Sequence, residues 1–79
     1  MSNPYPNCQW QHLSNDAWAF GEKVRGIIRN RLAEVYFSNA TKEHDMGWIW
    51  YTKGRRDHGL EPKIEWAIQK AEAALGIKG

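Results

Sequence analysis

Five tryptophans in 79 residues, two of them in the run Trp48-Ile49-Trp50-Tyr51, are the feature that most limits how this chain can fold. The chain has ten aromatic residues but only twelve Val, Ile and Leu residues. A single domain of this size buries only about 60% of its unfolded surface, and each buried ring removes roughly 150 to 250 Å² from water. Aromatic rings are therefore expected to supply much of the core.

Residues 14–36 are predicted to form the first helix. Ser14, Asn15 and Asp16 offer side-chain acceptors for a helix start. Gly21 and Gly26 weaken a helix by up to about 1 kcal/mol each relative to alanine, which suggests either close approach of another backbone or a tolerated weakness. The apolar residues that recur at three- and four-residue steps are Ala17, Phe20, Val24, Ile27, Ile28, Leu32 and Val35.

A second helix is predicted to begin at Glu61-Pro62 and to end before Gly76. Its apolar stripe is narrow and rich in alanine, which allows tight packing. Trp66 projects away from the line of Ile64 and Ile68, by about 100 to 200° at 3.6 residues per turn. Trp66 is therefore expected to make a separate contact or to be exposed.

Residues 41–59 give conflicting signals, because strand-favouring side chains in 48–52 lie between helix-cap residues at Thr41 and at Gly54 or Gly59. A third helix is favoured, since a lone strand would need a partner. The predicted fold is mainly α: a small three-helix domain over 14–79 with an extended N-terminal arm, residues 1–13. The alternative is a small α+β arrangement, with a short strand near 47–52 pairing with the arm, where Cys8, Trp10 and His12 alternate.

The aromatic and basic segment 48–56 indicates a contact surface, because cations suit phosphate and planar rings suit bases or sugars. At least one indole in this region is expected to stay exposed beside guanidinium groups. Arg25 and Arg29, four residues apart, add cations on adjacent turns of the predicted helix. The predicted nucleic-acid-binding or partner-binding residues are Arg25, Arg29, Trp48, Trp50, Lys53, Arg55 and Arg56.

A purely structural interpretation of the same residues is the commoner one. The rings would then be core, and Asp57 would pair with a neighbouring arginine. The formal net charge is only +2, and residues 14–40 and 41–60 each carry four cations and three acids. Such a moderate excess of positive charge is typical of an ordinary solvated surface.

Metal and catalytic chemistry have little support in the sequence. Cys8 with His12 is the only plausible pair of zinc ligands, whereas a structural site normally uses two. The chain lacks a Gly-rich phosphate loop, a nucleophile elbow and a His-Glu-x-x-His motif. We therefore expect no enzyme activity, no catalytic residue, no metal and no cofactor.

The leading hypothesis is a small non-enzymatic module that contacts nucleic acid or a nucleoprotein. The alternative is a protein-binding regulator or inhibitor, of the kind carried by mobile elements, that occupies a partner's surface. A homodimer is a weaker third hypothesis, motivated by the limited core. A single cysteine, no secretory signal and no long apolar run favour a cytoplasmic location without membrane association.

Overall fold

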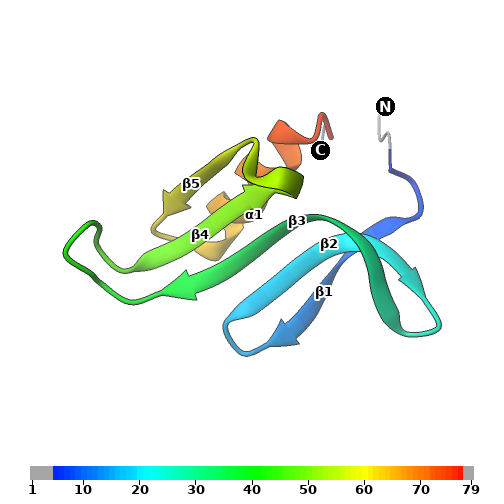
Figure 1. The fold of residues 1–79 in the computed structure, drawn as a ribbon, viewed down its shortest axis with the longest axis horizontal. Helices are drawn as coiled ribbons and strands as arrows, with labels where there is room; N and C mark the ends of the chain where they lie inside the picture. The colour runs from blue at the N-terminus through cyan, green and yellow to red at the C-terminus, as the bar shows by residue number, and fades with distance from the viewer. Residues whose placement is uncertain (1–4, 78–79) are drawn as a thin grey trace.

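The computed structural model describes residues 5–77, which form a five-stranded antiparallel sheet followed by one helix (Figure 1). The strands are adjacent in sequence order, β1-β2-β3-β4-β5, so each pairs with its neighbours along the chain. The elements are β1 (Cys8–Ser14), β2 (Ala17–Val24), β3 (Ile27–Ser38), β4 (Gly47–Thr52), the short 3₁₀ helix η1 (Lys53–Arg55), β5 (His58–Glu61) and α1 (Ile64–Ala74).

The prediction of a mainly helical, three-helix domain is wrong. Most of the predicted first helix, residues 14–36, lies in β2 and β3, which are the two longest strands and pair with each other. Between them, Arg25 (φ 52°) and Gly26 (φ 80°) take up the left-handed conformation that a two-residue hairpin turn requires. The apolar residues seen at helical spacing belong to two different strands, so their spacing along the chain carries no helical meaning.

Segment 47–52 is a strand, as the α+β alternative proposed, but its partners differ from the prediction. β4 pairs with β3 on one side, Val35 opposite Trp50, and with β5 on the other. The predicted arm contributes β1, which holds the alternating residues Cys8, Trp10 and His12 and pairs with β2. The first part of the predicted arm, residues 1–4, lies outside the described residues.

The predicted C-terminal helix is confirmed as α1. It begins at Ile64 rather than at the predicted Glu61-Pro62, since Glu61 is the last residue of β5. It is followed by Leu75 and by Gly76, which has a φ of 83°. Ala67 and Ala71 are fully buried against the sheet, so the alanine-rich stripe does allow close packing. Trp66 is 47% exposed and is thus the outward-facing ring of this helix.

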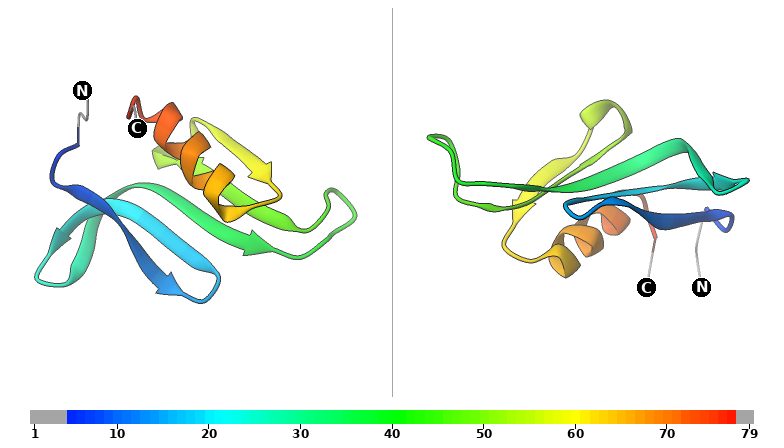
Figure 2. Two further views of the ribbon diagram at one scale, coloured as in Figure 1. Left: turned by 180° about the vertical axis from the view of Figure 1, so that it is seen from behind. Right: turned by 90° about the horizontal axis from the view of Figure 1, so that it is seen from below.

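The core lies between α1 and one face of the sheet. Its buried members from the strands are Phe20, Ala33, Val35 and Trp50, and from the helix Ala67 and Ala71. In the part of the chain that is described, α1 is the only α-helix, and both views of Figure 2 show it on one side of the sheet. The other side of β3, β4 and β5 is left without a helical cover, and we call it the open face.

Candidate nucleic-acid interface

The strand register decides which side chains point to the open face. Val35 and Trp50 are buried in the core, and neighbouring residues in a strand point to opposite sides of the sheet. Their sequence neighbours therefore point away from α1, and the pairing aligns these in two rows across the strands. The rows are Glu34, Tyr51 and His58, and Tyr36, Ile49 and Leu60.

All members of these rows except Glu34 line a shallow depression of about 450 Å³ on the open face. Two of its lining residues, Tyr36 and Tyr51, meet edge to face, with ring centroids 6.1 Å apart and planes 69° apart. Such tilted ring pairs are favoured by the aromatic quadrupole. The depression is lined by Tyr36, His44, Ile49, Tyr51, Arg55, His58, Gly59 and Leu60.

The Tyr51 ring is held by charged groups at both its face and its hydroxyl. The guanidinium carbon of Arg55 lies 4.7 Å from the ring centroid, which is a cation–π contact. The hydroxyl donates a 2.8 Å hydrogen bond to Glu34 Oε2. Glu34 in turn forms an ion pair with Arg31, with 3.3 Å between Nη1 and Oε1. Its negative charge is thus already partly compensated.

This environment raises the pKa of Tyr51 above its ordinary value. The largest cause is burial of the hydroxyl, which disfavours the phenolate. The hydrogen bond to Glu34 and the negative charge of that carboxylate act in the same direction, while Arg55 opposes them. Tyr51 is consequently a neutral hydrogen-bond donor at neutral pH, fixed in position by Glu34.

The two predicted tryptophans belong to the helix-covered side of the sheet. Trp50 is only 8% exposed, and its ring is part of the core. Trp48 is half-buried and packs edge to face on Phe37, at 5.4 Å between centroids. The expectation of an exposed central indole therefore fails for Trp50. The rings on the open face are Tyr36 and Tyr51, which the alternation with Val35 and Trp50 would have revealed had both strands been recognised.

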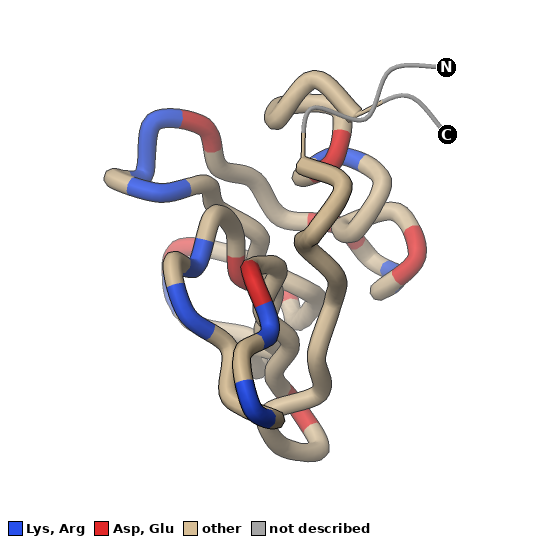
Figure 3. The backbone as a smooth tube through the Cα atoms, turned by 90° about the vertical axis from the view of Figure 1, so that its right-hand side faces the viewer, with Lys and Arg blue, Asp and Glu red and all other residues tan. Residues whose placement is uncertain are grey.

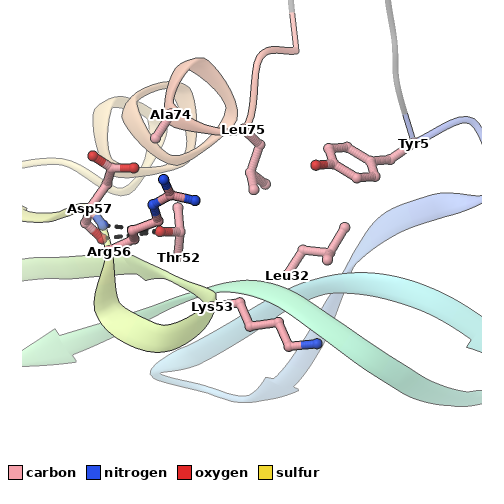
Figure 4. A pocket seen from close by; sticks show the side chains of 8 residues that line it. All are labelled: Tyr5, Leu32, Thr52, Lys53, Arg56, Asp57, Ala74 and Leu75. Carbon is pink, nitrogen blue, oxygen red and sulfur yellow. Dashed lines mark hydrogen bonds between the residues drawn. The ribbon is translucent and has the colours of Figure 1, made fainter.

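The predicted cations Lys53, Arg55 and Arg56 diverge at the turn after β4. Arg55 has a φ of 55° and lies over Tyr51 at the open face. Lys53 and Arg56 line a second hollow, of about 650 Å³, between this turn and the C-terminal end of α1 (Figure 4). The other residues around that hollow are Tyr5, Leu32, Thr52, Asp57, Ala74 and Leu75.

The turn itself is closed by Thr52 and Asp57. The Thr52 N–H donates to the Asp57 carbonyl oxygen at 2.9 Å, and the Asp57 N–H donates to Thr52 Oγ1 at 3.1 Å. Asp57 thus acts through its backbone here. Within residues 5–77, the recorded ion pair is Arg31–Glu34, and the expected pairing of Asp57 with an adjacent arginine is not seen.

Arg25 and Arg29 lie in the β2–β3 hairpin rather than on adjacent turns of a helix. Arg25 is in the turn. Arg29 in β3 lies opposite Glu22 of β2 in the backbone register of the sheet. Residues 22–31 carry four cations and one acid, so the hairpin has a local excess of positive charge. Figure 3 shows the Lys and Arg positions of this hairpin and of the turn after β4 on the same side of the molecule.

Within 5–77, no group of three His, Cys, Asp or Glu side chains is arranged to hold a metal ion. Burial raises the pKa of the Cys8 thiol, and the negative charge of Glu22, its partner across the strands, raises it further. The thiol is therefore not activated as a nucleophile. In the same part of the chain, no helix has the length and apolarity to cross a bilayer.

The fold and the site together define a small antiparallel-sheet domain with one face covered by a helix and the other carrying tyrosines beside arginine. Comparison of the chain with protein-family models, curated proteins and solved structures finds no match.

Proposed function

We propose that this protein is a small non-enzymatic module that binds nucleic acid through the open face and the cations around it. The observation that carries the proposal is the Tyr51–Arg55 pair, which places a guanidinium on an aromatic ring, 4.7 Å from its centroid, on the side of the sheet that has no helix. Planar rings next to cations suit a ligand that alternates flat bases with phosphates.

The charges of this region support the proposal. Arg55 in the turn after β4 and Arg25 and Arg29 in the hairpin belong to no ion pair recorded in the described part of the chain. Cations that are not paired internally remain available for phosphate. The nearest carboxylate on the open face, Glu34, is bound by Arg31 and by the Tyr51 hydroxyl. Repulsion of a polyanion by Glu34 is thereby reduced.

The test is fluorescence anisotropy with short labelled DNA and RNA at about 50 mM and about 200 mM salt. Affinity should fall steeply with salt, because bound phosphates release counterions. Each phosphate contact that is lost should make the slope of log K against log salt shallower by about 0.7 to 0.9. We expect this loss for Arg55→Gln and for Arg25→Gln, which keep a polar side chain at positions of positive φ.

Lys70→Gln is the matched control, since Lys70 is an exposed cation on α1, on the other side of the sheet. It should leave the salt slope unchanged. No binding of any oligonucleotide at low salt would reject the proposal. Recovery of one stoichiometric protein partner that survives nuclease treatment, together with that absence of binding, would instead support a protein-binding regulator or inhibitor.

A further inference from the structure

We infer that the form of nucleic acid that binds the open face is single-stranded, with an unstacked base held against Tyr36 and Tyr51. This inference rests on the proposed function and names its substrate class. The depression of about 450 Å³ is lined by both tyrosine rings and by the aliphatic side chains of Ile49 and Leu60. Its volume is within the range of about 300 to 1,000 Å³ typical of small-molecule sites.

A depression lined in this way suits a base that has left its stack. Inside a duplex the faces of the bases are covered by their neighbours, and only their edges are exposed in the grooves. An aromatic ring on a sheet can therefore use its π-face only with bases that are splayed out of a strand. Arg55 already covers one face of the Tyr51 ring, so Tyr36 is the ring proposed to stack on the base. Tyr51, held by Glu34 and Arg55, is an ordered neighbour before a base arrives, which lowers the entropic cost of binding.

The helix offers no competing duplex-binding surface. α1 carries Glu65, Lys70 and Glu72, an excess of one negative charge, and it packs on the opposite side of the sheet. Among the elements of residues 5–77, the β2–β3 hairpin, a two-stranded ribbon with four cations, has the shape and charge that suit a duplex groove. Binding by the hairpin alone would not use the tyrosines, so the two modes can be separated by substitution.

The experiment compares one sequence of about 12 nucleotides as single-stranded DNA, as single-stranded RNA and as the DNA duplex, with the full chain and at fixed salt. We expect either single strand to bind at least about tenfold more tightly than the duplex. Tyr36→Ala should weaken single-strand binding by about tenfold or more, the usual effect of removing a stacking ring. The difference in affinity between single-stranded DNA and single-stranded RNA then shows whether the protein distinguishes deoxyribose from ribose.

Trp66→Ala is the matched control. Trp66 is an exposed ring with a cation over it, Lys63 Nζ at 5.5 Å from the centroid, but it lies on α1. The Trp66→Ala substitution should leave the affinity for single strands unchanged. If Tyr36→Ala unfolds, as circular dichroism would show, Tyr36→Leu keeps the apolar volume without the π-face and should show the same loss.

Equal or tighter binding of the duplex, or unchanged single-strand affinity in both Tyr36 variants, would overturn the inference while leaving nucleic-acid binding itself in place. Failure of all three oligonucleotides to bind at low salt would instead remove the proposed function on which the inference depends. The two failures are therefore distinguishable within one titration series.

Discussion

The indole of Trp50 lies directly against Gly59, its partner across β4 and β5: a Cβ on residue 59 would be only 2.6 Å from Trp50 Nε1. Real Cβ atoms essentially never come so close, and the atoms that would have to move belong to a buried ring. The absence of a side chain at residue 59 is thus what allows a tryptophan to fill the core under β5.

Gly59→Ala should therefore destabilise the fold by about 1 to 3 kcal/mol, the usual cost of overpacking a core. For a domain of this size the melting temperature should fall by roughly 4 to 8 °C per kcal/mol. Thermal unfolding measures the loss. Adding Trp50→Phe should make the alanine substitution less costly in a double-mutant cycle, because the smaller ring leaves room. An unchanged melting temperature for Gly59→Ala would contradict this packing.

Glu72 links the helix to the first strand. Trp10 Nε1 donates a 3.0 Å hydrogen bond to Glu72 Oε2, and both groups are partly buried. Glu72→Ala should lower the free energy of unfolding by about 1 to 2 kcal/mol, because a charged acceptor is lost and the indole N–H is left without this partner. Denaturant unfolding gives the value. Gln69→Ala, at an exposed position of α1, should cost far less, and equal losses in the two variants would argue against this bond.

Stability should depend on Tyr51 at alkaline pH. Its pKa is raised in the folded protein, so folding favours the neutral phenol. The stability that results is fully present below the ordinary pKa of about 10 and is lost as the pH rises through the higher folded pKa. The free energy of unfolding, measured between about pH 8 and pH 11, should decline as the pH rises, and the decline should be smaller in Tyr51→Phe.

The titration of Tyr51 should also follow its two charged neighbours. Glu34→Gln removes a negative charge and should lower the pKa of Tyr51, whereas Arg55→Gln removes a positive charge and should raise it. Tyrosinate absorbance, taken as the difference from the same variant carrying Tyr51→Phe, measures both. Shifts in the reverse directions would mean that these contacts do not govern the hydroxyl.

Cys8 should react slowly with alkylating agents. Its pKa is raised by burial and by Glu22, so less of the thiol is ionised at a given pH than in an unstructured peptide. Alkylation by iodoacetamide near pH 8 should be slower for the folded protein than after unfolding in denaturant. Glu22→Gln should speed the reaction in the folded state, and a rate that matches the unfolded chain would show an accessible, unperturbed thiol.

The local signals in the sequence were sufficient for one element. Pro62 before the helix, Gly76 after it and the spacing of Ala67 and Ala71 act within a few residues of each other, and α1 forms in this segment. Its start is at Ile64 rather than at Glu61-Pro62, because Glu61 pairs in β5. The β2–β3 region was misread because its apolar residues satisfy a helical spacing along the chain. The true pattern is the alternation within each strand, as at Ala33 and Val35, and it emerges only when the turn at Arg25-Gly26 is recognised.

In the candidate site, too, one part could be predicted from neighbours in the sequence and another part depends on strand pairing. Aromatic residues precede Lys53, Arg55 and Arg56 in the sequence, and this proximity along the chain does not depend on the fold. The sequence did not indicate which rings face outward. A one-residue change of phase in β4 exchanges the faces of Trp50 and Tyr51, and the phase is set by pairing with β3.

By itself, then, the sequence indicated that aromatic rings contribute to the core, that the chain has a C-terminal helix, and that cations follow the rings of segment 48–52 along the chain. Only the tertiary structure decided that Trp50 is buried, that Tyr36 and Tyr51 share the open face, and that Arg55 separates from Lys53 and Arg56. The physical reason is that helix caps and turns depend on neighbours in sequence. The face on which a strand residue lies depends on partners brought together by folding.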